Sequence, residues 1–227
     1  MVVVERHHSK EDRARVFIVD DHPIARYGVA QLISHEQDLM VCGEAEDAIK
    51  ALEAIGTVKP DIVIVDISLG DTSGIELIKD IRIRYRKLPV LVLSMHSDPP
   101  YAERAFRAGA RGYVAKREVT GQVVKAIRQV LDGEIYVSEQ LAVRFVEDLV
   151  EGRVDTGGFP MDRLSDRELQ VFKLVGQGYR TSQIAEALHV GVKTVESYRE
   201  RIKGKLKLKR GTELLQLAIQ WVQGQKG

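Results

Sequence analysis

The stretch Ile62-Val63-Ile64-Val65-Asp66 decides the fold class of this chain. It is a continuous run of β-branched apolar residues that ends in a carboxylate, which is typical of a strand buried on both faces of a parallel sheet. A loop rich in glycine and serine follows at residues 68–74, and apolar residues then recur at helical spacing over residues 75–81. The pattern indicates a strand, a loop and a helix in that order.

The same succession of a buried strand and a helix occurs five times along the chain. The expected strands are residues 16–19, 39–41, 62–65, 90–93 and 112–115. The helices expected after them are residues 24–33, 48–55, 75–81, 101–108 and 123–130. Strands that alternate with helices form a parallel sheet with helices on both faces. We therefore predict an α/β fold, a flavodoxin-like (βα)5 doubly wound parallel sheet, over residues 15–133.

A second, small all-α domain of four helices is expected over residues 161–227. Each helix is preceded by a cap or turn signal. The signals are the capping box of Ser165 with Glu168, Thr181 as an N-cap, the turn at residues 189–191 before a helix over residues 192–206, and Thr212 as the cap of a helix that ends near Trp221. Residues 1–14 are expected to be a disordered tail. Residues 134–160 are expected to be a linker with a connecting helix from Ser138 to Val150.

The composition, with 44% hydrophobic and 30% charged residues among 227, suits a globular protein of one or two domains. The net charge of +1 is distributed unevenly along the chain. Residues 161–227 carry 13 Lys and Arg against 7 Asp and Glu, whereas the remainder carries 21 Lys and Arg against 26 Asp and Glu. The basic domain is therefore expected to meet a polyanion. A single cysteine, Cys42, excludes an internal disulfide, and no apolar run approaches the roughly 20 residues of a membrane span. A cytoplasmic protein is expected.

Polar residues follow four of the expected strands, at the edge of the sheet where the carboxyl ends of parallel strands meet. They are Asp20 with Asp21, Asp66, Ser94 and Lys116. Neighbouring carboxylates repel one another, and a Mg²⁺ ion relieves the repulsion, because it prefers a few carboxylates together with water and phosphate oxygens. With this ion bound, Asp66 can attack a phosphoryl group while Lys116 balances the charge on the transferred oxygens. Ser94 offers a hydroxyl to the product.

This arrangement resembles the receiver domain of a bacterial response regulator over about residues 15–132. The resemblance implies that Asp66 accepts phosphate from a sensor histidine kinase. It assigns the Mg²⁺ ligands as Asp20, Asp21, Asp66 and the main-chain carbonyl of Ser68. It also implies that Tyr113 and Ser94 are the coupled pair of switch residues that reports phosphorylation.

Several of these residues also have a plain structural interpretation. An aspartate after a strand is often the N-cap of the next helix, so Asp21 alone is weak evidence. A buried tyrosine such as Tyr113 is usually a core residue. His22 and His96 lie near the same edge without partners at metal-binding spacing, and we interpret both as loop residues. The presence of all the strand-end residues in the correct order favours phosphoryl transfer.

Residues 181–206 have the pattern of a helix-turn-helix, whose second helix lies in the major groove of DNA. Val195, Ile202 and Leu206 form its core stripe, so the opposite face is available to base edges. The expected contacts on and beside that face are Lys193, Thr194, Glu196, Ser197, Glu200 and Arg201. The expected phosphate contacts are Lys203, Lys205, Lys207, Lys209 and Arg210. Such a run of charges is, by itself, usually a solvated surface.

The basic domain resembles the LuxR-type helix-turn-helix of the NarL/FixJ response regulators through residues 164–168, 181–185 and 193–197. The resemblance implies that the last helix, about residues 212–222, pairs two copies on DNA. We therefore expect a transcription factor that binds double-stranded promoter DNA as a homodimer when phosphorylated. It is expected to have no membrane partner and no enzymatic activity beyond its own phosphorylation and slow dephosphorylation.

Two other functions stay open from the sequence. A magnesium-dependent phosphohydrolase could use Asp66 as its nucleophile, but it would need an acidic residue two positions later, where Ser68 stands. A DNA-binding protein that works without phosphorylation would have no use for the acidic pair or for Lys116. Both observations favour the phosphorylated regulator.

Overall fold

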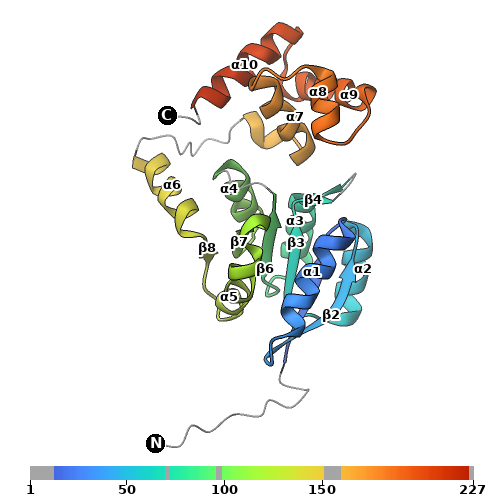
Figure 1. Ribbon diagram of the computed structural model, residues 1–227, viewed down its shortest axis with the longest axis vertical. Helices are drawn as coiled ribbons and strands as arrows, with labels where there is room; N and C mark the ends of the chain where they lie inside the picture. Colours follow the sequence, from blue (N-terminus) through green and yellow to red (C-terminus); the bar gives the residue numbers. More distant parts are fainter. Residues whose placement is uncertain (1–12, 70–71, 96–98, 151–159, 225–227) are drawn as a thin grey trace, which may run out of the picture. The chain divides into compact units, whose positions relative to one another are not determined.

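The computed structural model describes residues 13–69, 72–95, 99–150 and 160–224 (Figure 1). The chain divides into two compact units, Met1–Val154 and Asp155–Gly227, and each is described by itself. The expectations for residues 1–12 and 151–159 lie outside the described residues. No helix within the described ranges combines the length and the apolar character that a membrane span requires.

The first unit is built on one parallel sheet with the strand order β2-β1-β3-β6-β7-β8. Its strands are β1 (Ala14–Val19), β2 (Leu39–Ala45), β3 (Ile62–Asp66), β6 (Val90–Ser94), β7 (Gly112–Ala115) and β8 (Tyr136–Val137). A separate antiparallel pair, β4 (Ser68–Leu69) and β5 (Thr72–Ser73), lies where the glycine and serine loop was predicted. The order of the first five strands is that of a flavodoxin-like fold, which confirms the predicted fold class.

Helices cover both faces of this sheet (Figure 1). The helices are α1 (Pro23–Ser34) and α5 (Val119–Leu131) on one face, and α2 (Ala48–Val58), α3 (Gly74–Arg84) and α4 (Pro99–Ala108) on the other. Every residue of β3 and β6 is buried, as their continuous apolar runs predict. Ile18, Ile64 and Leu93 of the sheet pack with Ile33 of α1 and Ile127 of α5 in the main core. This packing fixes the carboxyl ends of the central strands at one edge.

The boundaries of the first unit differ from the prediction at both ends. β1 begins at Ala14, which pairs with Leu39, so this residue belongs to the sheet and not to the expected tail. Residues 136–137 form a sixth strand, β8, inside the expected linker. A strand of two residues is too short to leave a periodic signal in the sequence, which explains why it was missed.

The expected connecting helix is present as α6 (Glu139–Val150). Phe145 of α6 packs edge-on against Phe106 of α4, with 6.3 Å between the ring centroids. Leu141 of the same helix is buried. The first half of the expected linker is therefore a packed part of the first unit.

The second unit contains η3 (Pro160–Arg163), α7 (Asp166–Gly176), α8 (Thr181–Ala187), α9 (Val192–Leu206) and α10 (Gly211–Gly224). The four α-helices and the helix-turn-helix agree with the prediction. The capping box of α7 is also present: the Ser165 hydroxyl accepts a hydrogen bond from the Glu168 backbone N–H at 3.3 Å, and the Ser165 N–H donates to the Glu168 carboxylate at 2.6 Å. Trp221 packs edge-on against Phe172, with 5.8 Å between centroids, and this contact joins α10 to α7.

Two predicted helix caps in the second unit are wrong by one residue or more. Thr181 is the first residue of α8, and Arg180 stands at the N-cap, where its backbone N–H donates to the Gln183 side chain at 2.9 Å. Thr212 lies inside α10, which begins at Gly211. Here the Glu213 carboxylate accepts from the backbone N–H of Lys209 at 2.7 Å. In both helices a longer side chain from within the first turn replaces the threonine hydroxyl that was expected.

Candidate functional site

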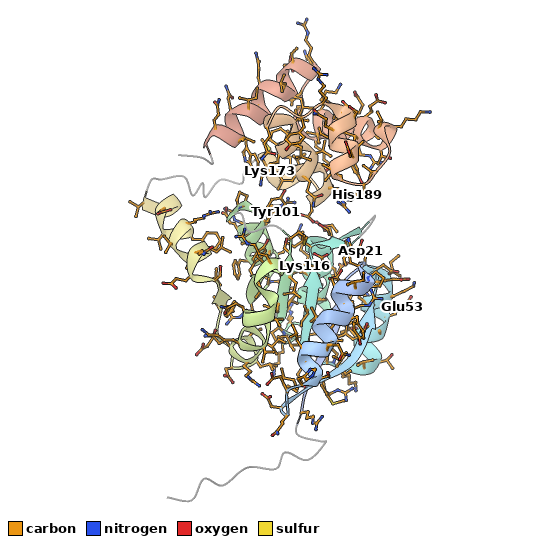
Figure 2. All side chains as sticks on the ribbon, viewed as in Figure 1. Asp21, Glu53, Tyr101, Lys116, Lys173 and His189 are labelled. Atoms are coloured by element: carbon orange, nitrogen blue, oxygen red, sulfur yellow. The ribbon has the colours of Figure 1, made fainter. Side chains whose placement is uncertain are left out.

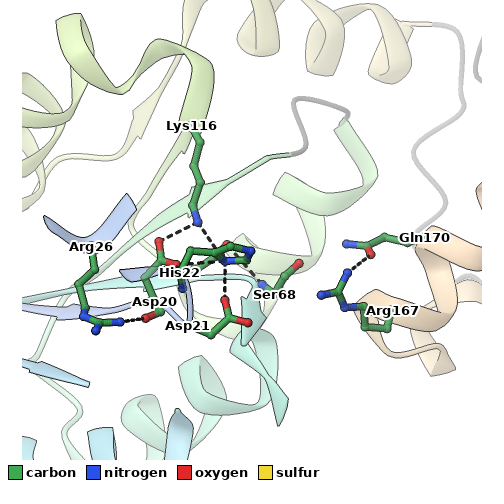
Figure 3. Close-up of polar contacts among 9 residues, drawn as sticks. Asp20, Asp21, His22, Arg26, Ser68, Lys116, Arg167 and Gln170 are labelled. Atoms are coloured by element: carbon green, nitrogen blue, oxygen red, sulfur yellow. Dashed lines mark hydrogen bonds and ion pairs between the residues drawn. The ribbon is translucent and has the colours of Figure 1, made fainter. Parts of the chain in front are cut away.

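Lys116 lies at the carboxyl edge of the sheet (Figure 2), where it meets Asp20 (Figure 3) and Asp66, as the sequence predicts. The Lys116 Nζ lies 2.7 Å from Oδ2 of Asp66 and 2.7 Å from Oδ2 of Asp20. Both aspartates are only 2% exposed. Ser94 is 1% exposed and is the last residue of the neighbouring strand β6. The residue before it, Leu93, pairs with Asp66 in the sheet. One ammonium group therefore joins two buried carboxylates that come from different strands.

Burial raises the pKa of Asp66 to about 6, although the charge and the hydrogen bond of Lys116 act in the opposite direction. Burial lowers the pKa of Lys116, but its charge interaction with Asp66 and its hydrogen bonds with Asp20 and Asp66 outweigh this effect, so the net shift is upward. Lys116 is thus held as an ammonium ion. The Asp66 carboxylate is costly to ionise and needs further positive charge nearby.

Asp21 completes an acidic cluster with Asp20 and Asp66, and His22 belongs to it as well (Figure 3). Each of these four residues offers one ligand atom, and the four atoms lie within 4.8 Å of one another. Carboxylates at such distances fit a divalent cation of the kind that prefers oxygen ligands. The Ser68 backbone N–H donates to Oδ1 of Asp66 at 3.3 Å, which places Ser68 beside the cluster. The role of its carbonyl as a ligand stays a prediction.

His22 lies in the loop before α1, as the sequence predicts, but it does have partners at metal-binding spacing, which the sequence did not indicate. Its imidazole Nδ1 lies 2.7 Å from Oδ1 of Asp21, and its backbone N–H donates to Oδ1 of Asp20 at 2.9 Å. The signal that could have found it is simple, because His22 directly follows the acidic pair. His96 lies outside the described residues.

Tyr113, the expected switch residue, is 1% exposed in the middle of β7. It lines a small cavity of about 10 Å³ together with Arg117 and the beginning of α6, where Leu141 and Arg144 face it. The ring is therefore a core residue in this conformation. A switching role is compatible with its place next to α6, and it stays a prediction.

The helix α9 presents the face that the sequence predicts. Val195 and Ile202 are buried against the rest of the second unit. The residues expected to contact base edges are all exposed, namely Lys193, Thr194, Glu196, Ser197, Glu200 and Arg201. Lys207 and Lys209, beyond the end of the helix, are also exposed. Their side chains are accessible to a polyanion.

Two of the expected phosphate contacts have partners within the protein. The Lys203 Nζ lies 2.8 Å from the Glu200 carboxylate, which is 72% exposed. The Lys205 Nζ lies 2.6 Å from the Glu168 carboxylate, which is only 3% exposed. The second pair links α9 to the capping box of α7, so Lys205 neutralises a buried charge. The sequence predicts a DNA contact for Lys205 because a partner 37 residues away leaves no local signal.

Comparison with known proteins agrees with the two units. Residues 16–128 match the response regulator receiver domain, and residues 162–218 match the bacterial regulatory proteins of the luxR family. The oxygen regulatory protein NreC of Staphylococcus aureus is 34% identical over 209 residues, which are 90% of this chain and 96% of that protein.

Solved structures give the same result. A LuxR-family two-component response regulator from Aurantimonas sp. SI85-9A1 has 36% identity and a TM-score of 0.57, over 63% of this chain and 99% of that one. The response regulator RcsB, in a structure with DNA, has 26% identity and a TM-score of 0.56, over 90% of this chain and 96% of that one. With the acidic cluster beside Lys116 and the exposed face of α9, these similarities show that the chain belongs to the NarL/FixJ family of response regulators, which join a receiver domain to a LuxR-type DNA-binding domain.

Proposed function

We propose that phosphorylation of Asp66 by a sensor histidine kinase switches the binding of this response regulator to promoter DNA. The observation that carries the proposal is the contact of Lys116 with Asp66 at 2.7 Å, inside a cluster whose other carboxylates can hold Mg²⁺. Phosphoryl transfer to a carboxylate uses all of these groups: the Asp66 nucleophile, the Lys116 ammonium and the carboxylates around a metal ion.

The residues of the site would share the work of the transfer. An Asp66 carboxylate oxygen forms a bond to the phosphorus atom as the bond from phosphorus to the histidine nitrogen of the kinase breaks. Asp20, Asp21, Asp66 and the main-chain carbonyl of Ser68 would hold Mg²⁺, which would supply positive charge to the transferred oxygens. Lys116 supplies the second positive charge, and the buried position of Asp66 keeps bulk water away from the acyl phosphate.

Phosphorylation adds a charge of about −2 and three acceptor oxygens at Asp66. Ser94, buried at the end of the adjacent strand, would donate its hydroxyl to one of them. Movement of the Ser94 side chain would leave space for Tyr113 to change position. The equilibrium between two conformations of the receiver domain would then shift. In this account the chain turns over no separate substrate and catalyses only its own phosphorylation and slow dephosphorylation, as a cytoplasmic regulator.

The exposed face of α9 would enter the major groove of double-stranded DNA. Base edges would be contacted by Lys193, Thr194, Glu196, Ser197, Glu200 and Arg201. Phosphates would be contacted by Lys203, Lys207 and Lys209, whereas Lys205 is engaged with Glu168. The RcsB structure with DNA supports DNA binding by this chain, and pairing of two copies through α10 would let a homodimer read two half-sites.

The transfer step is tested by incubating the full chain with phosphoramidate and Mg²⁺ and measuring the mass increase of one phosphoryl group. We expect the unaltered protein to be labelled and Asp66→Ala to be unlabelled. Asp132→Ala, which changes an exposed aspartate of the same unit, should be labelled normally. Undiminished labelling of Asp66→Ala would refute the assignment of the phosphoacceptor.

A further inference from the structure

A groove of about 1110 Å³ lies at the amino ends of the strands in the first unit. Its lining includes Ala14 and Val90, the first residues of β1 and β6, and Arg111, which directly precedes β7. The acidic cluster and Lys116 lie at the carboxyl ends of the strands. The groove is therefore separate from the phosphorylation site.

Apolar side chains from several elements form much of this groove. Leu88 precedes β6, Phe106 belongs to α4, Leu131 ends α5 and Phe145 belongs to α6, and all four are partly exposed. Ile135, just before β8, is 59% exposed. Small-molecule sites are concave and are lined mainly by apolar and aromatic side chains, with a few polar groups that fix orientation. The groove has this composition.

The polar part of the lining is strongly cationic. Arg82, Arg86, Lys87 and Arg111 line the groove together with one carboxylate, that of Asp61, so the net charge of these groups is +3. All four cationic residues are exposed. Within the part of the chain that the structure describes, none of the four forms an ion pair with a carboxylate. An anion would therefore complement the charge of the groove.

Two of the guanidinium groups are fixed by main-chain carbonyls. Nη1 of Arg82 donates to the Arg107 carbonyl at 3.3 Å, and the stem of Arg82 passes so close to Gly109 that a Cβ there would lie 2.6 Å from its Cδ. The Arg111 guanidinium donates to the Gly133 carbonyl. A carbonyl orients a guanidinium without neutralising it, and each group keeps further N–H donors for an anionic oxygen.

We propose that this groove binds a small anionic amphiphile, meaning an organic carboxylate or phosphate ester with an apolar body. The apolar side chains would cover the body of the ligand, and the guanidinium groups would bind its anionic head. The volume of about 1110 Å³ is close to the upper end of the range of roughly 300–1,000 Å³ for small-ligand sites. Because five separate elements surround the groove, a compact ligand fits it better than an extended chain. This inference does not depend on the proposed function.

Arg82 and Arg111 also have a purely structural interpretation. Their carbonyl partners lie in the last turn of α4 and just beyond the end of α5, where basic side chains often stabilise a helix. This role predicts that their loss lowers stability, with or without a ligand. It gives no role to Arg86 or Lys87. The test therefore relies first on these two residues.

The test is calorimetric titration of the full chain, in EDTA, with octyl phosphate and with its neutral analogue octanol. We expect octyl phosphate to bind the unaltered protein with a Kd below about 1 mM. Octanol, and octyl phosphate with the double variant Arg86→Gln/Lys87→Gln, should bind at least about tenfold more weakly. The matched control is Lys79→Gln/Arg84→Gln, which removes two exposed cations of α3 outside the groove and should leave the affinity unchanged.

Nuclear magnetic resonance locates the bound ligand. Octyl phosphate should shift the amide signals of residues 109–111 and 133–137, and not those of residues 20–22. A lack of binding by octyl phosphate, equal affinities in Arg86→Gln/Lys87→Gln and the unaltered protein, or shifts confined to other residues would overturn the inference. Binding of an acidic amphipathic peptide in place of octyl phosphate, or self-association that Arg86→Gln/Lys87→Gln removes, would assign the groove to a protein partner and contradict the proposal.

Discussion

Tyr113 of β7 and Val137 of β8 are paired in the parallel sheet. Val137 is the last residue of its strand, and α6 begins two positions later at Glu139. The proposed switch residue is therefore connected through one strand pair to the helix that leads out of the first unit. A change in the position of Tyr113 is therefore expected to affect α6, whose Leu141 and Arg144 line the same small cavity.

This connection predicts that Tyr113 couples phosphorylation to α6. Adding phosphoramidate and Mg²⁺ should change the hydrogen exchange of the amides in residues 139–150 of the unaltered protein. Tyr113→Ala should abolish the change, because it removes the buried ring that links β7 to α6, and it should also cost about 3–5 kcal/mol of stability. Tyr113→Phe keeps the ring and is the matched control. An unchanged exchange response in Tyr113→Ala would contradict the coupling.

The raised pKa of Asp66 predicts a pH dependence of stability in the absence of divalent cations. Because the folded-state pKa of about 6 exceeds the ordinary value of 3.8, the folded protein binds this proton more tightly than the unfolded chain does. The stability that the group contributes is present below about pH 4 and is lost as the pH rises through 6.

Asp66→Asn removes the cost of ionising this buried group. At pH 7.5 in EDTA the variant should be more stable than the unaltered protein by about 3 kcal/mol, and the difference should shrink towards pH 4. Urea denaturation at several pH values measures it, with the exposed Asp132→Asn as the control. A difference that does not vary with pH would show that ionisation of Asp66 is not its cause.

Two lysines of α9 are paired with carboxylates that differ in burial: Lys205 with Glu168, and Lys203 with Glu200. We therefore expect replacement of the two lysines to change stability by different amounts. Lys205→Met leaves the buried Glu168 carboxylate without its ammonium partner, and we expect a loss of about 2 kcal/mol in the stability of the second unit. Lys203→Met should cost less than about 1 kcal/mol, because its partner is exposed.

The same two variants should separate stability from DNA binding. Lys203→Met should lower the slope of the logarithm of DNA affinity against the logarithm of salt concentration by about 1, as expected for the loss of one phosphate contact. Thermal unfolding and titrations with DNA at several salt concentrations measure both effects. If Lys205→Met unfolds no more easily than Lys203→Met, the structural role of Lys205 is wrong.

Gly204 is a position where α9 can be stabilised. A Cβ at this residue would have no atom within 4 Å, and the residue lies in the interior of the helix. Gly204→Ala should therefore raise stability by about 0.5–1 kcal/mol. Gly176→Ala is the contrasting variant, because its Cβ would lie 2.3 Å from the Ala218 carbonyl oxygen, and it should destabilise the second unit. Equal melting temperatures for the two variants would contradict this packing.

The sequence predicts the fold well because its signals are local. The apolar run that ends at Asp66 is a strand buried on both faces of the sheet, as a continuous apolar run followed by a loop and a helix predicts. Asp20, Asp66 and Lys116 could be placed together because parallel strands end at a common edge. The α9 helix begins and ends as predicted, since its core stripe is regular.

What the sequence misses depends on contacts between distant segments. Strand β8 is stabilised by pairing with β7 and not by its own two residues. Lys205 looks like a solvent-exposed cation until Glu168 is placed beside it. The direction of the His22 ring depends on the turn between β1 and α1, which residue types alone do not specify.

The central claim is that phosphate on Asp66 controls DNA binding. The most direct measurement is the affinity of the full chain for double-stranded DNA. The DNA fragment is first selected from a random pool by the phosphoramidate-treated protein. Its affinity is then determined with and without phosphoramidate and Mg²⁺, for the unaltered protein and for Asp66→Ala. The account predicts that treatment tightens binding by the unaltered protein at least about fivefold and leaves Asp66→Ala unaffected. Equal affinity of the labelled and unlabelled protein, or an equal response in Asp66→Ala, would contradict it.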